Sequence, residues 1–426
     1  MKGEYLKMSM VKNIKDLIWG ENYKTSLKFS FAGIGLMGCR VADVISQITK
    51  NEKQVYNTLG ININEEDLGQ QIHLQNKLLL QCGYSAGGRN PNIGYEAVSL
   101  NRDKIQKSLA ELGKNSDFIW LVAGLGGGTG TGAILQLIEW AEQIKQFLNV
   151  GFGIIISVPQ TTEKIENKNA LKVLSVLNDF ASRRAIPIIV VDNELLFQKY
   201  LNEKSINEEF TNHSNIEIAN LLHRFNVITS SYIPYGSKHF DGQEFKYVLE
   251  NGGCIQFSKT ILTVFDFKDN LALKNKLQAH MQDGIASEGY DLKDATMAGV
   301  AVFVPSEDIA KAVFNVENIK ILDNTVNEIM PNADVRWGGY INSECKDIEV
   351  YTIISGLSLP SRIEDIPNLI RENGVPSMAK KLQLDVVEEH VNNSKDMSFT
   401  NPFQQKPVIT TENKKVNAPS WIYGNN

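Results

Sequence analysis

The chain has 426 residues, which is too long for one ordinary hydrophobic core and favours two domains with an additional segment. Its composition, 42% hydrophobic and 22% charged, is typical of a soluble globular protein and excludes a wholly disordered or collagen-like chain. The formal net charge of -6 argues against a body that coats nucleic acid non-specifically, although a local basic patch is compatible with it.

The cysteines and the start of the chain indicate the compartment. The four cysteines are widely spaced with no Cys-x-x-Cys pair, so we expect reduced thiols rather than a zinc site or a disulfide framework. The first residues contain no apolar block long enough for a signal peptide, and no stretch of about 18 apolar residues occurs. We therefore expect a cytoplasmic protein without a membrane span.

The N-terminal segment, residues 1–25, predicts a short amphipathic helix. Its apolar residues Val11, Ile14, Leu17 and Ile18 fall at helical spacing. Such a helix packs either on its own domain or on a neighbouring subunit, and the sequence leaves both alternatives open.

Residues 26–214 repeat a strand, turn and helix pattern. Near-continuous apolar runs of strand length are buried on both faces, and the helices between them supply the cover. The region is therefore predicted to be a doubly wound α/β domain with a parallel sheet. Its clearest strands are Asp117–Leu125, Val150–Pro159 and Ala185–Asn193, with shorter ones from Leu27 and over Leu59–Asn64.

The rest of the chain divides by composition. Residues 215–245 predict a long central helix followed by a loop, and residues 246–360 predict a second, smaller α/β domain. A helical extension is predicted over 361–391. The polar residues 392–426 are predicted to be a disordered tail. The tail ends in the apolar cluster around Trp421 and Tyr423, which is either a docking peptide or an apolar terminus without a partner.

The strongest chemical signal is a Gly-rich loop between a buried strand and a helix. Five glycines allow backbone N–H groups to approach an anion, two threonines add hydroxyl donors, and the helix adds the positive end of its dipole. The loop predicts a phosphate cradle and differs from the Walker A and dinucleotide-binding patterns. It consists of Gly126, Gly127, Gly128, Thr129, Gly130, Thr131 and Gly132.

Two further loops support this prediction. The turn Gly33–Gly38 follows the first strand and opens the first helix, and two such cradles at the carboxyl ends of parallel strands suit a polyphosphate site. The loop Gly83–Pro91 contains small residues and one arginine. It either closes over a terminal phosphate or is a plain surface loop.

Taken together, these motifs resemble the tubulin/FtsZ superfamily of polymerising GTPases over roughly Lys28 to Leu357. The resemblance implies binding of GTP or GDP with Mg²⁺, for which no protein ligand is assigned. It implies phosphate contacts from the loop Gly126–Gly132 and from Gly35, Leu36, Met37, Cys39, Arg40, Asn62, Asn64, Gly87, Gly88 and Asn90. It implies ribose or phosphate contacts from Pro159, Glu163 and Asn167, and guanine contacts from Asn193 and Asn220.

Two positions depart from the family pattern. Ile216 stands where an aromatic residue would stack on the base, and Asn167 stands where division-ring members usually have an arginine.

The segment His239–Phe245 resembles the catalytic loop of the superfamily, with His239 in place of the usual asparagine. Read alone, its Asp-x-x-Glu pattern is an ordinary start of a helix. The resemblance implies that Asp241 and Glu244 enter the nucleotide site of the next subunit and orient the attacking water.

Within the superfamily the chain is most similar to the TubZ group of plasmid- and phage-encoded members. This resemblance implies treadmilling head-to-tail filaments that segregate plasmid or phage DNA and reach it only indirectly, through a TubR-like DNA-binding adaptor held by the C-terminal region. TubZ tails are often distinctly basic, whereas this tail has few lysines, such as Lys414 and Lys415. A division or scaffold filament without DNA cargo, similar to FtsZ, is the main alternative, and a monomeric nucleotide-binding enzyme is the third.

Overall fold

The computed structural model describes residues 23–203, 210–363 and 366. Residues 1–22 of the predicted N-terminal helix, most of the helical extension and the whole predicted tail lie outside the described residues.

A single ten-stranded sheet runs through the described molecule, in the order β11-β10-β12-β9-β8-β7-β6-β1-β4-β5. All neighbouring strands are parallel except that β12 is antiparallel to both β10 and β9. The predicted α/β fold with a mainly parallel sheet is therefore confirmed. The strands are β1 (Phe29–Ile34), β4 (Asn57–Asn62), β5 (Asn76–Leu79), β6 (Phe118–Gly124), β7 (Gly151–Val158), β8 (Pro187–Asp192), β9 (Gly253–Leu262), β10 (Met297–Val304), β11 (Asp334–Ile341) and β12 (Ile348–Leu357), with a separate hairpin of β2 (Thr49–Lys50) and β3 (Lys53–Gln54).

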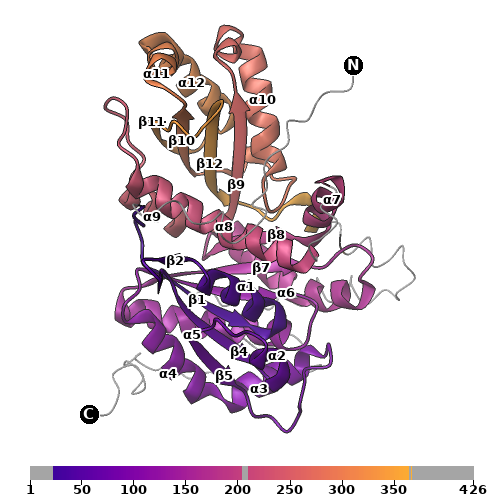
Figure 1. Cartoon of the computed structure of the whole chain (residues 1–426). Coiled ribbons are helices and arrows are strands. Elements are labelled where there is room, and N and C mark those ends of the chain that lie inside the picture. The colour runs from indigo at the N-terminus through magenta and orange to yellow at the C-terminus, as the bar shows by residue number, and fades with distance from the viewer. Residues whose placement is uncertain (1–22, 204–209, 364–365, 367–426) are drawn as a thin grey trace.

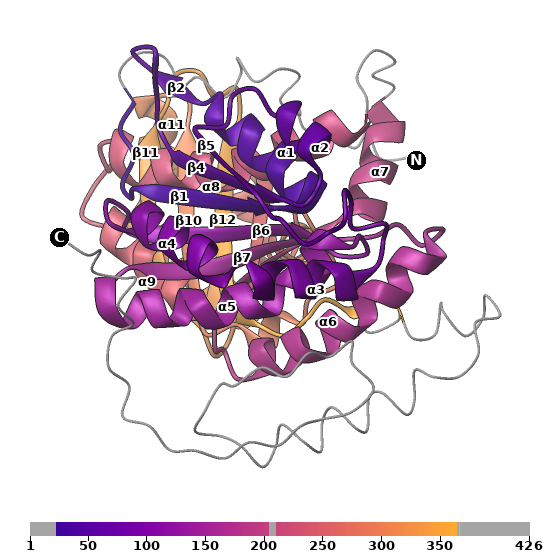
Figure 2. The same ribbon diagram turned by 90° about the horizontal axis from the view of Figure 1, so that it is seen from below.

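Helices cover both faces of the sheet, as Figure 2 shows for the layers around β1, β6 and β7. Side chains alternate along each strand: Leu121 of β6 packs in one buried cluster, and its neighbours Trp120 and Val122 pack in the other. The helices are α1 (Gly35–Ser46), α2 (Glu65–Gly69), α3 (Pro91–Leu100), α4 (Arg102–Gly113), α5 (Thr129–Leu148), α6 (Lys164–Ser182), α7 (Asn193–Glu203), α8 (Phe210–Ser231), α9 (Gly242–Glu250), α10 (Asn270–Asp283), α11 (Glu307–Val313) and α12 (Val316–Ile329), with 3₁₀ turns at Val264–Lys268 and Leu292–Asp294.

The long helix α8 lies across the middle of the molecule, between the strands that precede it and those that follow it (Figure 1). The two halves of the sheet meet where β8 pairs with β9, over the register positions Pro187–Gly253 to Ile189–Ile255. The halves that the sequence separates thus share one sheet, and the domain boundaries stay predictions.

Candidate functional site

The Gly-rich loop forms the turn between β6 and α5. Thr131 accepts a hydrogen bond through its Oγ1 from the N–H of Gly126 at 2.8 Å, which closes the loop. Gly126 has φ +115°, and a Cβ there would lie 2.6 Å from the Cβ of Glu166, so this position requires glycine. Gly127 is exposed, and a Cβ there would meet nothing within 4 Å. The loop is therefore open on the side of Gly127.

The first Gly-rich turn packs directly against this loop. Helix α1 begins at Gly35, whose φ is +69° and whose added Cβ would lie 3.0 Å from the backbone N of Gly130. A Cβ at Gly38 would lie 2.1 Å from the carbonyl O of Val122 in β6, so α1 touches the sheet backbone. The N-termini of α1 and α5 therefore lie side by side, and both helix dipoles favour an anion there.

Other predicted residues of the first turn differ in how they are placed. Leu36, Met37 and Arg40 are partly exposed, whereas Cys39 is buried. The Cys39 Sγ donates to the carbonyl O of Gly33 at 3.4 Å, and burial raises the pKa of this thiol to about 12. The side chain of Cys39 therefore belongs to the core, and only its backbone is available to a ligand.

The third loop lies on the same side of the sheet. A Cβ at Gly128 would lie 2.5 Å from the carbonyl O of Gly87, so the two loops are in backbone contact. Gly88 has φ +53° and faces open space. Asn90 caps α3 by accepting from the N–H of Asn92 at 3.1 Å. The structure thus brings the third loop onto the Gly-rich loop rather than leaving it apart on the surface.

Two side chains of α6, which the sequence analysis missed, hold these loops together. The Asn169 Nδ2 donates to the carbonyl O of Arg89 at 2.8 Å and to that of Gly126 at 2.9 Å. Glu166 pairs with Arg89, with 2.8 Å between Oε1 and Nη1. Their shared face on a helix that follows Pro159 and Glu163 is the one signal in the sequence that could have pointed to them.

The end of β4 contributes two asparagines. Asn62 is buried, and its Oδ1 accepts from the N–H of Ile63 at 2.9 Å. The Asn62 Nδ2 has no hydrogen-bond partner among the described residues. Asn64 caps α2 by accepting from the N–H of Asp67 at 2.9 Å. Asn62 therefore has a donor left over, and one acceptor position of Asn64 is used within the chain.

The turn after β7 contains the predicted ribose contacts. The Glu163 Oε2 accepts from the N–H of Gln160 at 2.7 Å. The Asn167 Nδ2 donates to the carbonyl O of Gln160 at 2.7 Å and to that of Glu163 at 2.9 Å. The Asn167 Oδ1 is buried without a partner among the described residues. Asn167, which departs from the usual arginine of division-ring members, thus shapes this turn.

The predicted guanine contacts come from two helices. Asn193 begins α7 directly after β8 and is partly exposed. Asn220 lies in α8 and is 4% exposed. Ile216, one turn earlier, is 1% exposed and packs in the core. The Ile216 side chain, at the position predicted to stack on the base, therefore packs in the core.

The two carboxylates of the catalytic-type loop, His239–Phe245, lie at the end of the sheet opposite to the Gly-rich loops. A Cβ at Gly242 would lie 2.7 Å from the Cβ of Ser26, which precedes the amino end of β1, whereas the Gly-rich loops follow the carboxyl ends. The six residues of β1 alone separate these ends by about 20 Å. Figure 1 shows α9 and α7 on opposite sides of the molecule. Within one chain, the carboxylates do not reach the loops.

Asp241 and Glu244 form a capping box at the start of α9. The Asp241 Oδ1 accepts from the N–H groups of Gln243 and Glu244 at 2.9 Å, and the Glu244 Oε2 accepts from the N–H of Asp241 at 3.3 Å. Each carboxylate keeps a second oxygen outside these bonds. Burial raises the pKa of Glu244 above its ordinary value.

Phe240 anchors this loop. Its ring is fully buried, and the Tyr340 OH accepts from its N–H at 3.1 Å and donates to its carbonyl O at 3.0 Å. Lys238 lies 4.5 Å from the Trp337 ring centroid and pairs with Asp323 at 2.8 Å. These partners come from β11 and α12, so the second half of the chain fixes the direction of the carboxylates.

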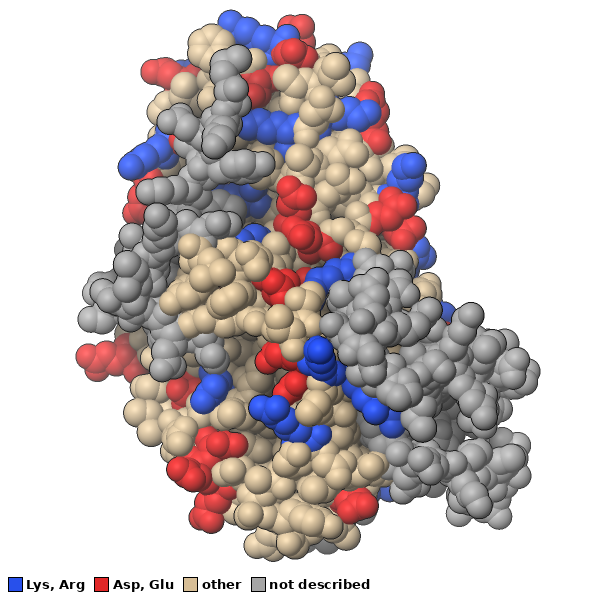
Figure 3. All heavy atoms as spheres, turned by 90° about the vertical axis from the view of Figure 1, so that its right-hand side faces the viewer, with Lys and Arg blue, Asp and Glu red and all other residues tan. Residues whose placement is uncertain are grey.

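Figure 3 shows the surface of the molecule on the side where α7 lies. Among the residues coloured there, Lys and Arg are interspersed with Asp and Glu rather than gathered in one block. In the described part of the chain, no helix has the length and apolarity needed to cross a membrane.

Comparisons with known proteins agree with this geometry. Residues 31–200 match the family model described as the Tubulin/FtsZ family, GTPase domain, and residues 238–361 match that of the tubulin-like protein TubZ, C-terminal domain. The tubulin-like protein TubZ of Bacillus cereus is 31% identical over 371 residues, covering 80% of this chain and 82% of the relative.

Two solved structures have a similar fold. One is the crystal structure of a GTPγS-form protofilament of Bacillus thuringiensis serovar israelensis TubZ, with a TM-score of 0.69 and 22% identity, covering 88% of this chain and 96% of the other. The other is described as a type III plasmid segregation TubZ, with a TM-score of 0.65 and 22% identity, covering 82% of this chain and 93% of the other.

Proposed function

The chain belongs to the tubulin/FtsZ family of GTPases, and we propose that it binds GTP at the loops after β1, β6 and β7 and hydrolyses it where two copies meet head to tail. One observation carries this proposal. The loops suited to phosphate and the two carboxylates of α9 lie at opposite ends of one sheet, about 20 Å apart along β1. Head-to-tail stacking of copies is the arrangement that joins the two ends.

The residues present fit a bound nucleotide. Two adjacent helix N-termini and an open Gly127 suit a polyphosphate. The Asn62 Nδ2 and the Asn167 Oδ1 are buried polar atoms without a partner among the described residues, and a ligand or a bridging water would complete both. Glu163, Asn193 and the other residues named in the sequence analysis stand as proposed contacts.

The catalytic step is assigned to the neighbouring copy. Asp241 and Glu244 would orient the water that attacks the terminal phosphate and accept its proton. Mg²⁺ bound to the phosphates would neutralise charge there. The capping box holds both side chains before assembly, because each is bonded to the backbone of its own helix start.

We further propose that the resulting filaments segregate plasmid or phage DNA, reaching it through a DNA-binding adaptor on the C-terminal region. Support comes from the match of residues 238–361 to the TubZ C-terminal domain and from the similar structure described as a plasmid segregation TubZ. The net charge of -6 fits an indirect contact with DNA. A scaffold filament without cargo predicts the same GTPase but no adaptor, so pull-down of a DNA–adaptor complex with polymerised protein separates the two.

A mixing experiment tests the shared site. Glu244→Gln removes the carboxylate of one end, and Gly127→Asp places a negative charge at the open side of the phosphate loop without a steric clash. We expect each variant alone to release little phosphate from GTP. A mixture should exceed the sum of the two, because one variant supplies the nucleotide and the other the carboxylate.

Two controls complete this test. Glu250→Gln, at the far end of α9 in a partly exposed pair with Lys246, should keep normal turnover. Glu244→Gln should still bind labelled GDP. Normal turnover by Glu244→Gln alone would contradict the shared-site mechanism.

A further inference from the structure

The segment after β12 returns to the turns of the proposed nucleotide site through one arginine. The Arg362 Nη1 lies 2.5 Å from the Asp192 Oδ1, and Nη2 donates to the carbonyl O of Pro159 at 2.7 Å. The side chains of Arg362 and Asp192 are 17% and 6% exposed, so this pair is shielded from water. Shielding strengthens the attraction between the two charges, and it also removes them from water, so that burial raises the pKa of Asp192 although Arg362 lowers it.

Each partner of Arg362 adjoins a residue that is proposed to bind the nucleotide. Asp192 ends β8 and immediately precedes Asn193, and its Oδ1 also accepts from the N–H of Glu194 at 2.9 Å at the start of α7. Pro159 follows β7 and opens the turn that contains Glu163. Arg362 therefore spans the carboxyl ends of two neighbouring strands.

A second link joins the same two turns. The Glu194 Oε2 accepts from the N–H of Thr161 at 3.0 Å and from its Oγ1 at 2.9 Å. Glu194 therefore joins the two turns directly, and Arg362 joins them through Asp192 and Pro159. Arg362 is the member that comes from outside the first half of the chain.

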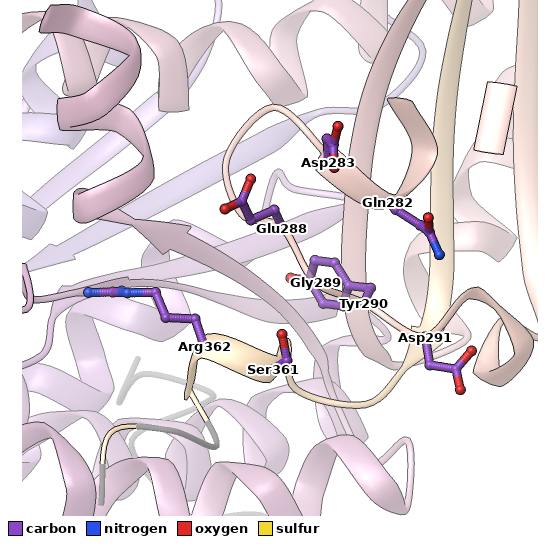
Figure 4. Close-up of a pocket in the computed structure, with 8 residues that line it drawn as sticks. All are labelled: Gln282, Asp283, Glu288, Gly289, Tyr290, Asp291, Ser361 and Arg362. Atoms are coloured by element: carbon purple, nitrogen blue, oxygen red, sulfur yellow. The ribbon is translucent and has the colours of Figure 1, made fainter. Parts of the chain in front are cut away.

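Arg362 also borders a polar cavity of about 670 Å³, whose lining includes Asp283, Glu288 and Asp291. Figure 4 shows the guanidinium extending away from Asp283 and Asp291, and its hydrogen-bond partners are Asp192 and Pro159 instead. Lys199 of α7 donates to the carbonyl O of Gly284 at 2.9 Å on the loop that carries Glu288. The arginine is thus committed to the two turns rather than to the cavity.

We propose that Arg362 is a positioning residue for nucleotide recognition: it fixes the ribose turn and the base turn relative to each other, so that retention of the nucleotide depends on the segment after β12. This inference rests on the proposed function. The guanidinium suits the task because its planar fork bonds a carboxylate and a carbonyl at once. A lysine offers one point charge and does not hold both turns in the same way.

Release of a fluorescent mant-GDP from the full chain measures this effect. We expect Arg362→Ala to release it roughly tenfold faster, the size of one lost charge-assisted contact, and Arg362→Lys to fall in between. Asp192→Asn keeps an acceptor for the α7 cap but loses the ion pair, and it should resemble Arg362→Ala. The double variant should be little worse than either single one, because both remove the same interaction.

Base preference provides a readout that a general loss of stability would not change. Arg362→Ala should reduce the preference for GTP over ATP in displacing mant-GDP, because Asn193 loses its fixed position. Arg183→Ala removes an exposed pair with Asp179 on α6 and should leave both measurements unchanged.

The outcomes separate the two proposals. Unchanged release and unchanged preference in Arg362→Ala and Asp192→Asn, beside a wild type that binds mant-GDP, would overturn the role of Arg362 alone. A wild type that binds neither mant-GDP nor GTP would overturn the proposed function itself. If Arg362→Ala does not fold, Arg362→Lys and Asp192→Asn decide the question.

Discussion

Replacing Tyr340 with phenylalanine tests whether the second half of the chain fixes the position of the catalytic-type loop, His239–Phe245. Tyr340 is 0% exposed, and its hydroxyl bonds both the N–H and the carbonyl O of Phe240, next to Asp241. Burial raises the pKa of Tyr340 to about 12, so the hydroxyl keeps its proton and remains a donor at neutral pH.

The size of the effect follows from those two bonds. Each buried backbone group left unpaired costs about 1–3 kcal/mol, so we expect Tyr340→Phe, which leaves two such groups, to lower the free energy of unfolding by about 2–6 kcal/mol. GTP turnover should fall as well, because the backbone that carries Asp241 loses its anchor. Binding of labelled GDP, at the other end of the sheet, should remain.

Urea unfolding, phosphate release and GDP titration measure these three quantities. Tyr351→Phe is a matched control: Tyr351 lies in the same core, and its hydroxyl donates to the Glu349 Oε2 at 2.7 Å without touching the loop. We expect it to lose only about 1 kcal/mol and to keep its turnover. Equal unfolding free energies and equal turnover for the two variants would refute the reasoning.

Two further predictions concern the nucleotide end and the pH dependence. Gly38→Ala should weaken both GDP binding and thermal stability, because its Cβ would lie 2.1 Å from the carbonyl O of Val122. Gly127→Ala is the control, and it should change stability little because its Cβ would face open space. GDP titration and thermal unfolding of both variants check this prediction. Because burial raises the pKa of Glu244, turnover should decline on acidification beginning above pH 4.5, the ordinary value of a glutamate. A pH profile that stays flat down to 4.5 in assembled protein would show that the ionised Glu244 is not needed.

The central strands could be predicted because burial on both faces leaves a direct mark on the sequence. The apolar runs of β6, β7 and β8 begin and end within two residues of their predicted bounds. Strand β11 was not predicted from the sequence, because it contains charged residues and two adjacent glycines. A Cβ at Gly339 would lie 2.6 Å from the Phe314 ring, and one at Gly338 would lie 2.6 Å from the Tyr340 OH. Glycine at these two positions leaves room for the aromatic side chains of Phe314 and Tyr340, a requirement that only the tertiary structure reveals.

The candidate site also has one part that the sequence predicts and one part that it does not. The glycine loops are local in sequence, and their positions after strands predict their place at the carboxyl edge of the sheet. The side chains that hold them act over long distances in sequence: Asn169 bonds the carbonyl O of a residue 80 positions away, and Arg362 bonds a carbonyl O 203 positions away. Because any backbone carbonyl can accept such a bond, the sequence contains no pattern that identifies the pair.

The separation of the two ends has a consequence for control of hydrolysis under the proposed mechanism. A single copy holds its own Asp241 and Glu244 at the other end of the sheet from its phosphate loops, so bound GTP does not meet these two carboxylates until a neighbour docks. The neighbour brings Asp241 and Glu244 already held by their capping box and by the bonds between Tyr340 and Phe240, so little reorganisation is needed on contact. Assembly would then precede hydrolysis in every subunit, and the time between the two events would be set by how the neighbour places its carboxylates.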